Sequence, residues 1–234
     1  MTTAALATLG EVFLRCRDMD AALGERLEAY SSAVRRLIPD YAAAVDQLVS
    51  RLSDNGAGTN SPAPGEPMPK FVLPDENGHL TSLESLLRSG PVAITFHRGH
   101  WCPWCRISGR ALAQVHRDIV AVGGQVVAIM PERQKFAAQF KASAQYPFPV
   151  LTDLDNGYAL SLGLAIWVGP DLERLLSSFG RSLPDYQGNE AWILPIPATF
   201  VVGTDGRVAA RFIDPDFRRR MSIEELLAAL EGAA

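Results

Sequence analysis

The stretch Trp101-Cys102-Pro103-Trp104-Cys105 carries the strongest signal in this chain. It follows an apolar segment typical of a buried strand and precedes a helical pattern. The chain contains only three cysteines, so a pair three positions apart at a strand-to-helix junction indicates a functional dithiol in a βαβ unit. The helix start offers unpaired N–H groups and a positive dipole end, which lower a thiol pKa from about 8.5 toward neutrality. We therefore interpret this stretch as a redox site.

Strands and helices alternate on both sides of this site. The composition and periodicity predict strands at 71–74, 79–80, 91–96, 125–130, 149–151, 198–202 and 208–212, and helices at 82–88, 103–122, 132–144, 156–162 and 222–230. The segment 169–192 is irregular apart from a predicted helix at 171–179. This alternation predicts an α/β fold with a mostly parallel sheet and helices on both faces.

The N-terminal part has a different pattern. Apolar residues recur at three- and four-residue spacing from 8 to 52, and Pro39 interrupts them once, which predicts two helices. We expect an N-terminal helical extension at 1–53, a linker rich in Gly, Pro, Ser and Asn at 54–69, and the catalytic domain at 70–234. The apolar stripe of the extension either pairs two subunits into a homodimer or covers the catalytic domain.

Composition excludes several classes of partner. The chain has 234 residues, 47% of them hydrophobic, and a net charge of −4. Nucleic-acid binding needs a basic surface, and we interpret the one basic cluster, Arg218-Arg219-Arg220, as a solvated patch. No apolar run reaches the roughly 20 residues that cross a bilayer, and residues 1–20 do not have the pattern of a cleaved leader. We expect a cytoplasmic protein without a membrane partner, in a compartment where a dithiol is more often catalytic than structural.

Residues 70–230 resemble the thioredoxin superfamily, and within it the peroxiredoxin (AhpC/TSA) branch. The resemblance is carried by the run Phe-His-Arg-Gly-His-Trp-Cys-Pro-Trp-Cys at 96–105, by Leu-Thr-Asp at 151–153, and by Pro-Ala-Thr-Phe-Val-Val at 197–202 before Thr-Asp-Gly at 204–206. It implies a thioredoxin-like fold with a mostly parallel or mixed central sheet. It also implies a thiol peroxidase that needs no cofactor or metal, acts on a peroxide, and is reduced by an external dithiol donor such as a thioredoxin.

The resemblance leaves open which sulfur attacks. The peroxiredoxin motif Pro-x-x-x-Thr/Ser-x-x-Cys puts Arg98 at the Pro, Cys102 at the Thr and Cys105 at the peroxidatic cysteine. The thioredoxin motif Trp-Cys-Gly-Pro-Cys makes Cys102 the attacking residue and Cys105 the resolving one. The same residues satisfy both motifs, and we favour Cys105 by the first.

The chain departs from the peroxiredoxin pattern in ways that suggest substitute residues. Pro197 occupies the position of an activating Arg; it resembles the cis-proline of thioredoxins, beside which Ile196 would offer its backbone to a substrate. Ser108 occupies the position where many relatives have Glu. Arg98 and Arg106 are the adjacent donors that could replace the missing Arg, with Arg98 as the catalytic candidate. Trp101 and Trp104 flank the thiols and are candidates for binding an organic hydroperoxide or a partner protein.

Other interpretations compete with a peroxidase. His97 and His100 could complete a zinc site with the two cysteines, although structural zinc sites usually gather ligands from two separated knuckles, and His100 fits better as a modulator of the thiol pKa. Cys16 lies on an apolar helix stripe and fits a small buried hydrophobe. Besides a peroxidase that acts on hydrogen peroxide or organic hydroperoxides, the residues are compatible with two further functions. One is a protein disulfide oxidoreductase, and the other is a non-enzymatic redox sensor whose disulfide changes how the N-terminal helices dock.

Overall fold

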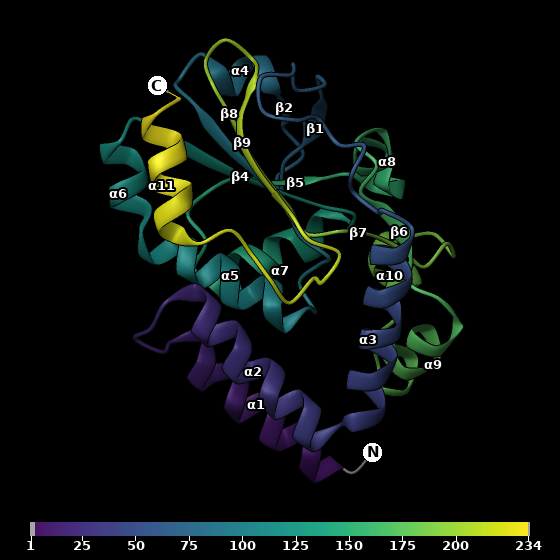
Figure 1. Cartoon of the computed structure of the whole chain (residues 1–234). Helices are drawn as coiled ribbons and strands as arrows, with labels where there is room; N and C mark the ends of the chain where they lie inside the picture. Colours follow the sequence, from purple (N-terminus) through teal and green to yellow (C-terminus); the bar gives the residue numbers. More distant parts are fainter. Residues whose placement is uncertain (1–2, 234) are drawn as a thin grey trace.

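A five-stranded mixed sheet forms the centre of the molecule (Figure 1). The computed structural model describes residues 3–233, with side chains from residue 5 onward. The strand order is β5-β4-β3-β8-β9, with the strands at Val150–Thr152 (β5), Gln125–Met130 (β4), Val92–Phe96 (β3), Ala198–Val202 (β8) and Val208–Ile213 (β9). β3, β4 and β5 run parallel, whereas β8 and β9 are antiparallel to their neighbours. The predicted thioredoxin-like α/β fold is confirmed.

Helices cover both faces of this sheet, as predicted. The face that carries Ala128 and Val201 packs against Pro103–Gln114 (α5), His116–Ala121 (α6), Gln134–Ala144 (α7) and Ile223–Glu231 (α11). The face that carries Ile94 and Phe200 packs against Leu83–Leu87 (α4) and Gly157–Ser161 (α8), which follows the short 3-10 turn Leu154–Asn156. All five residues of β3 are buried because helices lie on either side of it. The helix predicted at 103–122 is interrupted at Val115, where α5 ends and α6 begins.

Three helices, not two, precede the sheet: Thr3–Arg17 (α1), Leu23–Leu37 (α2) and Pro39–Asp54 (α3). The prediction missed the break at 18–22 because the apolar spacing continues across it. Arg26 stabilises this turn by donating from Nε to the Ala21 carbonyl at 2.8 Å and from Nη1 to the Arg17 carbonyl at 3.3 Å. In Figure 1, α1 and α2 lie side by side below α5, and α3 lies beside the green helix α9.

Two smaller units complete the fold. The predicted hairpin before the sheet is present as Val72–Pro74 (β1) and Leu80–Ser82 (β2). The predicted helix within 169–192 is present as Pro170–Ser178 (α9), and the prediction missed a second helix at Leu183–Gln187 (α10). It also missed Ala165–Trp167 (β6) and Ile193–Pro195 (β7), which pair antiparallel and close this segment into a loop. Within residues 3–233, no helix is both long and apolar enough to span a membrane.

Candidate active site

The two cysteines lie where β3 is followed by α5. Cys102 is the residue immediately before the helix, and Pro103 opens it, a position that proline suits because its missing N–H has no helical partner there. Cys105 therefore lies in the first turn, close to the positive end of the helix dipole. Both side chains are free thiols and both are fully buried. Buried thiols at a helix start depend on local donors for their charge state, so their neighbours decide which one ionises.

Cys105 is surrounded by groups that favour a thiolate. Its Sγ lies 3.4 Å from the backbone nitrogen of Arg98, which donates to it, and 3.6 Å from Nη2 of Arg220. Burial raises the pKa of the Cys105 thiol, but a hydrogen bond from Cys102, the proximity of His97 and the positive charge of Arg220 more than offset it. The pKa of Cys105 consequently lies well below its usual value.

Cys102 has the opposite environment. Burial raises the pKa of its thiol well above the usual value, and the hydrogen bond that it donates to Cys105 and the negative charge of Cys105 raise it further. One proton is thus shared unequally: Cys102 holds it, and Cys105 carries the charge. This arrangement corresponds to the peroxiredoxin motif, with the Cys102 thiol in the place of the Thr hydroxyl.

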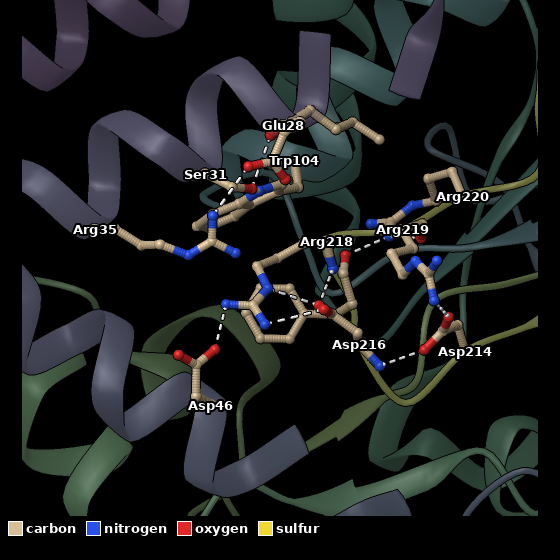
Figure 2. Close-up of polar contacts among 12 residues, drawn as sticks. Glu28, Ser31, Arg35, Asp46, Trp104, Asp214, Asp216, Arg218, Arg219 and Arg220 are labelled. Carbon is tan, nitrogen blue, oxygen red and sulfur yellow. Dashed lines mark hydrogen bonds and ion pairs between the residues drawn. The ribbon is translucent and has the colours of Figure 1, made fainter. Parts of the chain in front are cut away.

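Arg220 is the site residue that the sequence analysis missed, and the interpretation of 218–220 as a solvated patch is wrong for Arg218 and Arg220 and holds only for Arg219. Figure 2 shows that these three arginines differ in their partners. Arg218 is only 12% exposed and bonds Asp216 at 2.7 Å and Asp46 of α3 at 2.6 Å. Arg219 is 71% exposed and pairs with Asp214. Arg220 donates to the backbone carbonyls of Phe217 and Arg219, which holds its Nη2 beside Cys105.

A signal for this anchoring was available in the sequence. Asp214 and Asp216 directly precede the cluster, and apolar residues bracket it at Phe217 and Met221. Both apolar side chains are buried. A basic run bounded by apolar anchors and matched carboxylates indicates a loop that packs on the domain, in contrast to a solvated patch.

The backbone N–H of Arg98 donates a hydrogen bond to Cys105, but the Arg98 side chain lies away from that sulfur. The guanidinium is 2% exposed, and its carbon lies 3.7 Å from the ring centroid of Phe217 and 5.2 Å from that of Trp101. Its Nη1 and Nη2 are buried without a hydrogen-bond partner within the described part of the chain. Arg106, the other candidate donor, stacks its guanidinium 4.4 Å from the Phe13 ring of α1.

The two histidines have separate partners. His97 Nε2 lies 3.1 Å from Thr95 Oγ1, and that hydroxyl donates to the Val127 carbonyl at 3.2 Å. His100 lies 2.9 Å through Nδ1 from Glu132, which also accepts its backbone N–H at 2.7 Å. Burial raises the pKa of the Glu132 carboxyl. In the described residues, no three His, Cys, Asp or Glu side chains gather as a metal ion would require.

Gly99 allows this segment to pack closely. Its φ of +143° is one that side chains rarely allow, and a Cβ there would lie 2.6 Å from Glu132 Oε1 and 2.7 Å from Trp101 Nε1. Only glycine combines this backbone conformation with such a close approach.

The remaining predicted site residues have different positions. Trp101 and Trp104 are both buried, and Trp104 Nε1 donates to Ser31 Oγ of α2 at 2.9 Å. The prediction of a cis-proline is wrong, because the bond preceding Pro197 is trans. Ile196 does not offer a free N–H to a substrate, since it donates to the Leu164 carbonyl at 2.8 Å, and its side chain packs on the sheet face opposite the dithiol. Cys16 is a buried hydrophobe, as predicted.

Comparisons with known proteins identify a family and support the fold. The sequence model of the AhpC/TSA family matches residues 64–211, more than half of the chain. Thiol-disulfide oxidoreductase ResA of Bacillus subtilis is 27% identical over 65% of this chain and 68% of its own length. Rv2521 of Mycobacterium tuberculosis, provisionally named a peroxiredoxin, is 29% identical over 62% of this chain and 81% of its own length. The crystal structure of Peroxidoxin BcpB from Mycobacterium tuberculosis superposes with a TM-score of 0.57 at 21% identity, covering 74% of this chain and 99% of that one, and so supports the fold.

Proposed function

Because this chain belongs to the AhpC/TSA family, we propose that it is a thiol peroxidase in which Cys105 attacks the peroxide and Cys102 resolves the product. The observation that carries this proposal is the asymmetry of the dithiol. Cys105 has the lowered pKa and receives N–H donors from Arg98 and Arg220, whereas the pKa of Cys102 is raised. A thiolate is the nucleophile in peroxide reduction, so this asymmetry supports Cys105 as the attacking cysteine and Cys102 as the resolving one.

The reaction follows from these positions. The Cys105 thiolate attacks one peroxide oxygen and the O–O bond breaks, leaving a sulfenic acid on Cys105. The leaving oxygen takes up a proton and departs as water or an alcohol, and Arg220 at 3.6 Å from the sulfur is placed to stabilise its negative charge. The Cys102 sulfur then attacks the sulfenic sulfur, water leaves, and a Cys102–Cys105 disulfide forms. An external thiol donor returns both cysteines to the reduced form.

A small cavity beside Arg220 favours a small peroxide, although the Cys105 sulfur is not part of its lining. It is lined by His97, Thr199 and Arg220, and its volume is about 10 Å³. That is close to the minimum that holds a single water molecule, and hydrogen peroxide is only slightly larger than water. A large organic hydroperoxide would need the Arg220 loop to move.

A protein disulfide oxidoreductase is the second candidate, favoured by the similarity to ResA, which is named for that activity. It would require Cys102 to attack an incoming disulfide. The raised pKa of Cys102 opposes this role in the reduced state, because a neutral thiol is a poor nucleophile.

Single-turnover kinetics distinguish the candidates. The reduced wild type, Cys105→Ser and Cys102→Ser would each be mixed with hydrogen peroxide, thiol loss followed by stopped flow, and oxidised residues identified by mass spectrometry. We expect rapid disulfide formation in the wild type. Cys102→Ser should react at a similar rate but stop at a sulfenic acid on Cys105 that dimedone traps. A wild type no faster than free cysteine, together with reduction of a model disulfide that depends on Cys102, would instead establish the oxidoreductase.

A further inference from the structure

A second, larger cavity lies between the N-terminal helices and the active-site stretch. Its volume is about 180 Å³. Phe13 of α1 and Tyr30 of α2 form part of one wall, and Trp101 and Trp104 form part of the other. The cavity therefore exists because the N-terminal helices pack over the segment that contains the dithiol.

Among the described residues, Arg106 and Arg181 line this otherwise largely apolar cavity, and no acidic side chain does. Arg106 has a pKa lowered first by burial and then by the positive charges of Arg17 and Arg181, and its Nε is buried without a hydrogen-bond partner. No ion pair joins Arg106 or Arg181 to a carboxylate within residues 5–233. Cations that repel each other around a cavity favour an anionic occupant.

This cavity borders the stretch that contains both cysteines, although neither buried sulfur is part of its lining. Trp101 and Pro103, the chain neighbours of Cys102, both line it. Cys102 lies close enough to Tyr30 and Arg106, two other lining residues, that its ionised form would raise the pKa of both groups, although burial has the larger effect on each pKa. The Cys105 sulfur lies instead beside Arg220, which lines the small cavity. Cys102 is thus the cysteine on the side of the larger cavity.

The chemistry of disulfide reduction selects the Cys102 side. When a thiolate attacks a disulfide, the sulfur with the lower thiol pKa is the better leaving group. Cys105 is stabilised as a thiolate by the Arg98 N–H and Arg220. An incoming donor should therefore attack the Cys102 sulfur and expel Cys105, so the donor needs access from the larger cavity.

The N-terminal helices restrict which donors can reach that sulfur. Ser31 of α2 bonds Trp104, and Asp46 of α3 bonds Arg218 (Figure 2). Trp101 and Trp104 are 4% and 2% exposed beneath these helices. A folded dithiol protein such as a thioredoxin would have to displace this whole cover, whereas a small molecule in the cavity would have to displace only the side chains that separate it from the buried Cys102 sulfur.

We propose that the electron donor is a small thiol bearing a carboxylate, bound in this cavity by Arg106 and Arg181. Its thiolate attacks Cys102, the Cys102–Cys105 bond breaks, and Cys105 leaves as a thiolate. A second donor thiolate attacks the donor sulfur of the mixed disulfide, releasing the donor disulfide and the Cys102 thiolate, which takes up a proton. With the peroxide step, one peroxide and two donor thiols give an alcohol or water, one water and one donor disulfide. This donor assignment rests on the proposed function.

The test measures disulfide reduction without peroxide. The full chain would be oxidised with diamide, the Cys102–Cys105 disulfide verified by mass spectrometry, and its reduction followed by tryptophan fluorescence with 3-mercaptopropionate, 2-mercaptoethanol and cysteamine. Each thiol is compared between wild type and Arg181→Met, so that intrinsic thiol reactivity cancels. We expect Arg181→Met to slow the reduction of the disulfide by 3-mercaptopropionate about three- to fivefold, the range for one partly exposed charge pair. Reduction by 2-mercaptoethanol should be unchanged, and reduction by cysteamine should be unchanged or faster.

Arg174→Met is the matched control, because Arg174 lies on α9, pairs with the exposed Asp171 and does not line the cavity. It should leave all three rates unchanged. Equal effects of Arg181→Met on the three thiols would overturn the proposal. So would faster reduction of the wild type by a thioredoxin with no preference for carboxylate among small thiols. Since no peroxide is used, a failed peroxidase assay with an intact carboxylate preference would refute the proposed function and leave the donor site standing.

Discussion

The charge of Arg220 should control the reactivity of Cys105. Two unit charges at the observed 3.6 Å interact by about 1.2 kcal/mol in a water-like medium and by about 4.6 kcal/mol at an effective dielectric constant of about 20. One pKa unit corresponds to about 1.4 kcal/mol. Because Arg220 is partly exposed, the lower half of this range applies, so Arg220→Met should raise the pKa of Cys105 by about one to two units.

The pKa can be measured by alkylating the reduced protein with iodoacetamide across a pH series and quantifying the Cys105 peptide by mass spectrometry. The peroxide rate near neutrality should fall by more than the loss of thiolate alone, since the same guanidinium is placed to stabilise the leaving oxygen. Arg220→Lys should retain part of the shift because it keeps the charge.

Arg219→Met provides the control, because Arg219 is the exposed neighbour and pairs with Asp214 instead of Cys105. It should leave the Cys105 pKa unchanged. A folded Arg220→Met protein whose Cys105 titrates as in the wild type would refute the reasoning and return the activating role to the guanidinium of Arg98.

Three further predictions concern pH and packing. The peroxide rate should be flat from neutral to alkaline pH and fall only as acid protonates Cys105, because its lowered pKa keeps the reactive thiolate populated; a rate that rises through the usual thiol pKa of about 8.5 would contradict this. Gly99→Ala should destabilise the fold by roughly 2–4 kcal/mol in urea unfolding, since its Cβ would lie 2.6 Å from a carboxylate oxygen. Gly78→Ala, also at positive φ but in open space, should cost only about 1 kcal/mol. Ser31→Ala should lower the free energy of unfolding by about 1–3 kcal/mol, because it leaves the buried Trp104 N–H unpaired. Ser32→Ala, at an exposed neighbouring position, should leave the stability nearly unchanged. Equal melting temperatures for the two serine variants would show that the Ser31–Trp104 bond does not hold α2.

Local patterns in the sequence were sufficient for most elements of the domain. The Asn-Gly and Asp-Gly pairs predicted two turns that the structure contains, at β1–β2 and at β8–β9. The apolar runs predicted the buried strands β3 and β4. These signals are reliable because turn chemistry and side-chain alternation act over a few residues. The break at 18–22 was missed for the converse reason: the apolar period continues across it, and the arginine that stabilises the turn lies beyond it on α2.

The sequence by itself determined the dithiol, its place at a helix start and the family-like fold, because each depends on residues that are close in the chain. The tertiary structure alone decided which sulfur ionises. Arg220 is 115 positions from Cys105 in sequence, and the β9-to-α11 loop, held through Asp46 of α3, brings it to the sulfur. The cover over Cys102 likewise depends on the docking of α1 and α2. Electrostatic interactions and burial act through space, so the asymmetry of the two thiols arises only once the distant segments have packed together.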